Sequence, residues 1–114
     1  MERMIQSTQT LRASATFNTT ANVSFSNSSL LKFVESVIIY FNISAQSSLN
    51  MEAQLQISPD NTNWYTKASF GPYTANQTTP EEVSGPFGNY QRLRLIRNAG
   101  SCTLEILADM VEEV

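Results

Sequence analysis

The stretch that most constrains the fold of this chain is residues 51–70, MEAQLQISPDNTNWYTKASF. Its first half alternates strictly between apolar and polar residues, which places the apolar set on one face of an extended strand. The segment from Pro59 to Asn63 follows, and Pro, Asp and Asn are the residue types that favour tight turns. The apolar pattern resumes at Trp64, and a short polar connection of this kind is a common hairpin loop. The stretch therefore predicts a β-hairpin whose turn is stabilised by the side chain of Asp60.

The rest of the chain repeats this alternation in short segments and contains no convincing helix. Turn-forming residues separate the segments, so we expect connections at residues 45–50, 71–72, 84–89 and 98–101 and a loop at 26–29. The expected strands are 8–17, 21–25, 36–44, 51–58, 64–70, 80–83, 90–97 and 102–110, with a further short candidate at 31–34. Seven or eight short strands with one apolar face each predict an all-β fold, an antiparallel β-sandwich or jelly roll.

The length of 114 residues fits one domain with a single core. We divide it into an N-terminal arm or edge strand, residues 1–20, and a β-sandwich domain, residues 21–114. The arm is sparse in apolar residues, and we name those on one phase of it as candidate assembly residues: Leu11, Ala13, Ala15 and Phe17. The arm could pair with a neighbouring subunit by adding a strand to its sheet, or serve as the first strand of its own sheet. The sequence leaves both alternatives open.

The residue types needed for catalysis or metal binding are scarce. The chain has no His, which removes the usual general base and the commonest metal ligand. Its single cysteine, Cys102, is in phase with the apolar positions of its strand, so we expect it to be buried. We therefore expect no catalytic, cofactor-binding or metal-binding residues, no cofactor, and a protein that is not an enzyme.

Charge and hydropathy exclude two classes of partner. The net charge is −3, and the basic residues are spread out except for Arg92, Arg94 and Arg97, so no basic stripe is available for nucleic acid. Charged residues interrupt the longest apolar run, residues 30–43, so we expect no membrane span. No signal peptide is evident in the first residues. Only 15% of the residues are charged, and a surface of hydroxyls and amides favours an extracellular or virion protein.

Aromatic residues raise the alternative of carbohydrate binding. Aromatic rings can stack on the faces of sugars, and we name Trp64, Tyr65 and Tyr73 as candidate ligand-facing residues. Trp64 opens a strand directly after a turn, where it could equally close the end of the core. The sequence alone favours core packing for this residue.

Two segments carry a resemblance to a known group of proteins. Residues 55–64, LQISPDNTNW, and residues 85–94, GPFGNYQRLR, resemble small β-sandwich proteins of tailed-phage virions, in which an SPDGTNW turn and a later YxRLR strand recur. That group includes capsid decoration, or cement, proteins. Asn61 stands where Gly is usual in the turn, and Asn also tolerates a positive φ. The resemblance extends over about residues 37–110; its motifs are structural, so it implies a fold and a virion role but no functional residue.

A looser, architectural similarity is to the jelly-roll subunits of bacterial spore appendages and extracellular fibres. We expect a non-enzymatic, self-assembling structural protein, a capsid decoration subunit at the virion surface whose partners are further copies of itself and a major capsid protein. The first alternative is a filament subunit, extracellular or on a spore surface, that polymerises through its N-terminal strand. The second alternative is a carbohydrate-binding module.

Overall fold

The computed structural model describes residues 3–25 and 35–113, and these form six β-strands that pair in antiparallel fashion. No helix occurs in these residues. The strands are β1 (Arg3–Phe17), β2 (Ala21–Ser24), β3 (Ser36–Ser58), β4 (Tyr65–Tyr73), β5 (Gln77–Ser84) and β6 (Tyr90–Glu113). The all-β antiparallel fold expected from the sequence is confirmed.

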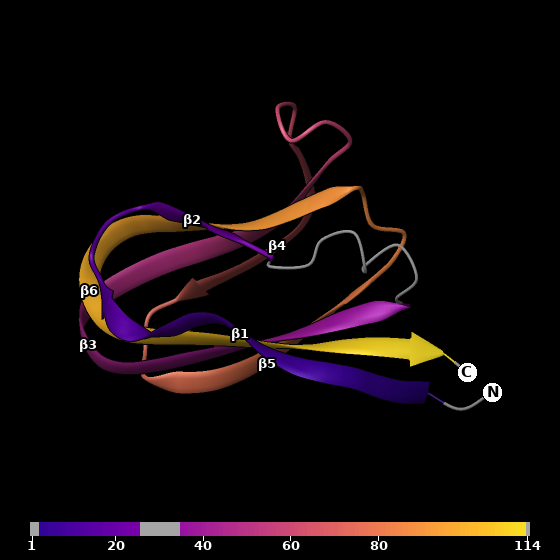
Figure 1. Cartoon of the computed structure of the whole chain (residues 1–114). Coiled ribbons are helices and arrows are strands. Elements are labelled where there is room, and N and C mark those ends of the chain that lie inside the picture. The colour runs from indigo at the N-terminus through magenta and orange to yellow at the C-terminus, as the bar shows by residue number, and fades with distance from the viewer. Residues whose placement is uncertain (1–2, 26–34, 114) are drawn as a thin grey trace.

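The two longest strands, β3 and β6, organise the molecule. They pair with each other from Ser36 opposite Val111 to Ser58 opposite Tyr90, and every other strand pairs with one of them. The register of this ribbon shifts between Ser44 and Met51, where the two strands turn over together. Figure 1 shows the ribbon curling back so that its two halves face each other.

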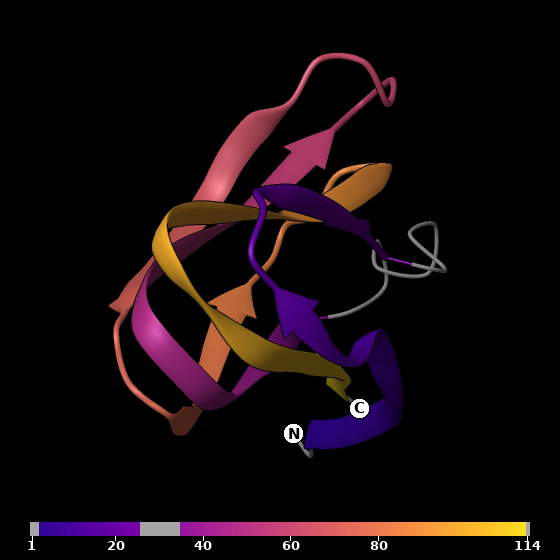
Figure 2. The same cartoon turned by 90° about the vertical axis from the view of Figure 1, so that its left-hand side faces the viewer.

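The folded ribbon gives the protein two layers. The first layer consists of β1, residues 102–113 of β6, residues 36–44 of β3, and β5. The second consists of β2, residues 90–97 of β6, residues 51–58 of β3, and β4. β1 and β2 lie on the β6 side, and β4 and β5 lie on the β3 side (Figure 2). The arrangement is a β-sandwich in which both layers share the same two long strands.

Three predicted connections are wrong: residues 71–72 lie inside β4, and residues 45–50 and 98–101 lie inside β3 and β6. Ala45, Ser48 and Gly100 have positive φ values of 50°, 50° and 68°. Such residues bend a strand and add a bulge without ending its pairing. We call residues 45–50 and 98–101 together the corner. Small polar residues and Gly here mark a bend within a strand. The sequence predicts eight short strands, whereas the structure has six, and two of these are long.

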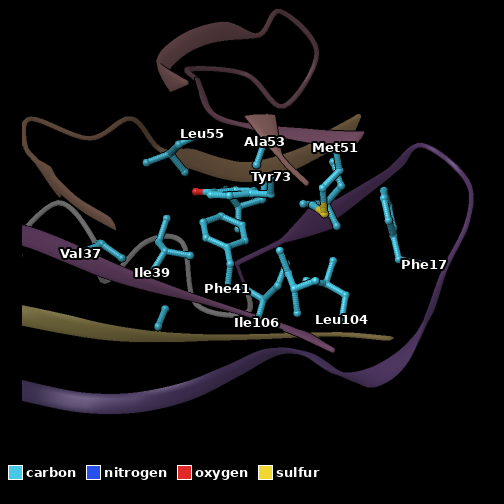
Figure 3. Close-up of a cluster of buried hydrophobic side chains, with 14 of the residues drawn as sticks. Phe17, Val37, Ile39, Phe41, Met51, Ala53, Leu55, Tyr73, Leu104 and Ile106 are labelled. Carbon is cyan, nitrogen blue, oxygen red and sulfur yellow. The ribbon is translucent and has the colours of Figure 1, made fainter. Parts of the chain in front are cut away.

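Alternating side chains fill the space between the layers, as the sequence pattern predicts. Figure 3 shows side chains from both halves of β3, together with others from β6 and β4, meeting in one cluster. The ring of Phe41 is central, with its centroid 5.8 Å from that of Phe70 and 5.3 Å from that of Tyr73. Cys102 is buried in this core, as predicted.

The N-terminal strand β1 pairs with β6 of its own chain, from Arg3 opposite Glu113 to Phe17 opposite Cys102. Its register shifts three times, and these irregularities break the single apolar face expected for it. Phe17 is 2% exposed in the core and Leu11 packs against the core, whereas Ala13 and Ala15 are exposed. The four candidate assembly residues therefore do not share a face. The loop expected at 26–29 and the short strand at 31–34 lie outside the described residues.

Candidate functional site

The hairpin turn between β3 and β4 forms the tip of the molecule and projects beyond the two layers (Figure 1). The Asp60 carboxylate holds it: Oδ1 accepts hydrogen bonds from the backbone N–H groups of Thr62 (2.9 Å) and Asn63 (2.8 Å), and Oδ2 accepts one from Asn63 Nδ2 (2.7 Å). These bonds favour the ionised form and hold the pKa of Asp60 well below its usual range. Asn61 has φ 60°, as a turn of this kind requires. The predicted role of Asp60 is confirmed.

A second segment, residues 84–90, lies against this hairpin although it is distant in sequence. Asn89 Nδ2 donates to the backbone oxygen of Pro59 (3.3 Å), which ties the two segments together. Gly88 sits close to the end of β3, since a Cβ at Gly88 would lie 3.1 Å from the carbonyl oxygen of Ser58. A side chain here would therefore require a small shift of one of the two backbones.

These two segments and the start of β4 line an open pocket of about 270 Å³, which we call the tip pocket. Tyr65 is 61% exposed and forms one wall, while Phe87 packs partly against the core. The lining residues are Ile57, Ser58, Pro59, Tyr65, Phe87, Gly88 and Asn89. The pocket therefore combines aromatic rings and an aliphatic side chain with an amide and backbone polar groups.

Ile57 lines this pocket because the sandwich ends here. The alternation of residues 51–58 predicts an inward Ile57 between outward Gln56 and Ser58. Ile57 is instead only half-buried, whereas Gln56 and Ser58 are buried. Ser58 Oγ donates to Asp60 (3.0 Å) and Gln56 accepts from Arg92, so both polar side chains are satisfied where they are covered.

Trp64 lies outside the tip pocket, on the outer face of the second layer. It is half-buried, and the guanidinium carbon of Arg92 lies 4.2 Å from the centroid of its ring. Arg92 Nε also donates to Gln56 Oε1 (2.7 Å). Trp64 is not part of the core cluster, so the core packing favoured by the sequence does not describe it. The ring is covered by the arginine.

Tyr73 is not ligand-facing, which corrects the expectation from sequence. It is 5% exposed and its ring packs on Phe41 in the core (Figure 3). The reason is that β4 continues past residues 71–72, where a strand break was expected, and Tyr73 pairs opposite buried Met51. Burial raises the pKa of Tyr73, and its hydroxyl donates to Glu81 Oε2 (3.1 Å). Of the three candidate aromatics, Tyr65 alone contributes to the pocket.

Within residues 3–25 and 35–113, no three His, Cys, Asp or Glu side chains are grouped so that they could hold a metal ion. The same part of the chain contains no helix with the length and apolarity to cross a membrane.

Comparisons with known proteins show a likeness of fold. No family model matches the chain, and no curated protein does. Among solved structures, the chain is similar to CBM29_1, a family 29 carbohydrate binding module from Piromyces equi. The identity is 10%, the alignment covers 90% of this chain and 89% of that chain, and the TM-score is 0.46. A likeness of this degree supports no statement about ligands of this chain.

Sequence reasoning identified Tyr65 but not the other walls of the pocket. Phe87 and Asn89 fall within the predicted turn at 84–89, which carries no sign that it lies against a hairpin about thirty residues earlier. Pairing of Tyr90 with Ser58 brings the two together. That register depends on the long β3–β6 ribbon, whereas the sequence pattern predicts several separate short strands in its place.

Proposed function

We propose that this chain is a non-enzymatic carbohydrate-binding module and that the tip pocket is its binding site. The observation that carries the proposal is Tyr65, a large aromatic side chain that is 61% exposed and forms a wall of a defined pocket. The exposed ring presents a flat apolar face on which a ligand can stack. A sugar ring supplies a C–H face that stacks on such a ring.

The other lining groups fit the polar edge of a sugar. Asn89 and the backbone at Ser58 and Gly88 surround the pocket, and amide and peptide groups hydrogen-bond hydroxyls in both directions. The pocket has no charged lining residue among those named above. A neutral polyhydroxylated ligand matches this combination better than an ion does.

The volume limits the affinity. About 270 Å³ lies below the usual range for drug-sized ligands, so the pocket suits one or two sugar rings and weak binding. Polysaccharides repeat the same unit, and several linked copies of a weak module bind them much more tightly than one copy does. We therefore expect the functional ligand to be a polymer displayed on a surface.

The test is retention of the whole chain by a panel of immobilised neutral polysaccharides. Tyr65→Ala should weaken retention about tenfold, the value of one aromatic contact. Tyr90→Ala is the matched control, because Tyr90 is 40% exposed but does not line the pocket. Wild-type protein that is retained by no polysaccharide, or equal losses in both variants, would contradict the proposal.

A second candidate function is a capsid decoration subunit at the virion surface. The specific observation in its favour is that the two segments resembling virion proteins form one unit, with Gln56 opposite Arg92 and Ser58 opposite Tyr90. In this proposal the partners are other copies of the chain and a major capsid protein. Electron microscopy of empty capsids incubated with the purified protein tests it, and capsids without regular added density would count against it.

A filament built through the N-terminal strand draws less support. The register of β1 is irregular, and Arg12 donates to the backbone oxygens of Ala15 (3.1 Å), Thr16 (3.0 Å) and Leu104 (2.5 Å), which ties β1 to β6 of its own chain. Bulges and charged side chains at a sheet edge hinder pairing with another chain. Deleting residues 1–17 tests this alternative, since a filament of this kind requires them.

A further inference from the structure

The outer face of the second layer carries two arginines side by side. Arg92 and Arg94 are two residues apart on β6, so their side chains point to the same side of the sheet, opposite the buried Leu93 and Leu95. Both arginine side chains are half-buried. Within residues 3–25 and 35–113, neither guanidinium forms an ion pair with a carboxylate. Two positive charges therefore lie on this face without a compensating charge in contact with them.

Neutral polar side chains flank both arginines. Arg94 lies opposite Asn22 on β2 and opposite Gln54 on β3. Arg92 lies between a hydroxyl and an amide on the same two strands. Neighbouring strands are about 4.8 Å apart, so each guanidinium has a hydroxyl or amide group beside it on either side. The surface consists of the two arginines and the four residues paired with them, Arg92, Arg94, Asn22, Ser24, Gln54 and Gln56, and we call it the arginine face.

Arg92 is held in place by two neutral groups. Its guanidinium carbon lies 4.2 Å from the centroid of the Trp64 ring, and its Nε donates to Gln56 Oε1 (2.7 Å). In the described part of the chain, its two terminal nitrogens donate no hydrogen bond, and the same is true of the whole Arg94 guanidinium. A guanidinium that is already ordered loses less conformational entropy when it binds a ligand. The face therefore offers one ordered set of free N–H donors and a second set beside it.

The acidic residues nearest to the arginine face have partners elsewhere. Glu52 lies on β3 two residues from Gln54 in the direction of the corner, and its Oε2 accepts a hydrogen bond from Asn98 Nδ2 (2.8 Å). The Asp60 carboxylate accepts hydrogen bonds within its own turn. The net charge of the chain is −3, but the arginine face itself carries two positive charges and no negative one. Its chemistry is therefore that of an anion-binding surface.

The neutral residues of this face indicate what kind of anion fits. Apolar groups are scarce here, since Arg92 covers the ring of Trp64, and protein–protein interfaces usually have an apolar centre. Two arginines do not form the basic stripe that tracks a nucleic-acid backbone. A guanidinium pairs with a planar carboxylate through two parallel hydrogen bonds, and amides bind hydroxyl groups in both directions. Acidic sugars carry a carboxylate and hydroxyl groups on the same ring.

We propose that the arginine face binds an acidic polysaccharide built from uronic acid units. Arg92 and Arg94 each pair with a carboxylate of the ligand, while Asn22 and Gln54 bind hydroxyl groups of the same sugars. Two residues along a strand span about 6.6 Å, so the two guanidiniums engage carboxylates on different units of the polymer. A repeating ligand therefore satisfies both arginines at once, whereas a single acidic sugar satisfies one.

This site is separate from the tip pocket. The pocket is lined at the end of the sandwich and shares no residue with the arginine face. The proposal therefore does not rest on sugar binding at the tip. A chain that binds acidic polymers but no neutral one would support the arginine face and contradict the tip pocket.

The experiment is affinity electrophoresis of the full chain in native gels that contain a polysaccharide. The probes are polygalacturonate, alginate and hyaluronan, each compared with its own methyl ester, which has the same backbone without the charge. The wild type should bind at least one of the acids, and bind the matching ester about tenfold more weakly. Raising the salt concentration should weaken binding to the acid. The comparison is repeated in the Tyr65→Ala variant, where the preference for the acid should persist.

Arg94→Gln should weaken binding to the acidic polymer about tenfold, because it removes a hydrogen-bonded contact with a charged group. Arg94→Lys keeps the charge but not the planar fork, so it should recover only part of the loss. The matched control is Arg97→Gln, which removes the same charge at the corner, where Arg97 Nε donates to the backbone oxygen of Gly100. It should leave binding unchanged. Urea denaturation of each variant separates loss of binding from loss of folding.

Four results would overturn the proposal. The first is a wild-type protein that binds none of the acids, and the second is equal binding of each acid and its ester. The third is an equal loss in folded Arg94→Gln and Arg97→Gln variants. The fourth is tighter binding of dextran sulfate or duplex DNA than of every uronate, which would show attraction by charge alone or a nucleic-acid partner.

Discussion

The corner and the tip both reverse the direction of the chain, but different interactions determine their geometry. At the corner the backbone itself decides the geometry: Gly100 has φ 68°, and a Cβ there would overlap the carbonyl oxygens of Ser47 and Ser48. At the tip, side chains determine the geometry. The Asp60 carboxylate accepts hydrogen bonds within the turn, and Asn89 donates one from the neighbouring segment to the turn. The corner therefore tolerates little change, whereas the tip leaves room for residues to be exchanged.

The largest effect should come from Gly100→Ala. The substitution adds a Cβ against two backbone carbonyls and forces Ala into a positive φ, so the free energy of unfolding should fall by about 3 kcal/mol or more. Urea denaturation measures the change. Gly85→Ala is the control at the tip side of the sandwich, where a Cβ would make only ordinary contacts, the nearest at 3.4 Å. Equal losses in the two variants would remove the distinction between corner and tip.

Asp60→Ala should produce an intermediate effect that depends on pH. The pKa of Asp60 is lowered in the folded protein, so the stability it contributes is present above its unfolded pKa of about 4 and disappears as the pH falls through the folded value. The variant should therefore melt at a lower temperature than the wild type at neutral pH, and the difference should shrink in acid. Calorimetry between neutral and strongly acidic pH measures it. A difference that stayed constant with pH would mean that the carboxylate does not hold the turn.

Asn61→Gly should have the smallest effect. Asn61 already adopts φ 60°, which Gly adopts without strain, and no side-chain hydrogen bond of Asn61 is found in the described part of the chain. We expect the free energy of unfolding to change by less than about 0.5 kcal/mol. Chemical denaturation against the wild type checks this. A clear loss would show that the Asn61 side chain contributes to the tip.

The local parts of the fold could be predicted from the sequence. The hairpin of residues 51–70 has strict alternation and a turn whose residues act within a few positions of one another, so its pattern is sufficient. The burial of Cys102 follows from the same rule. These predictions succeed because the interactions that determine these features join residues close together in the sequence.

The remaining features depend on contacts between distant segments. Residues 45–50 and 98–101 contain turn-forming residues, but each bends a strand because the other bends beside it. The irregular register of β1 separates Leu11 and Phe17 from Ala13 and Ala15, and only its pairing with β6 determines that register. Trp64 and Arg92 come together for the same reason. A single-strand pattern carries none of this information.

The pairing of β1 with the last part of β6 also has a consequence for biosynthesis. Residues 3–17 leave the ribosome about a hundred residues before their partner, residues 102–113. Until then, the long β1 has an unpaired edge on both sides, and such edges are prone to aggregation. Most residues of β1 are polar or small, and such a composition lowers the tendency of an unpaired strand to aggregate.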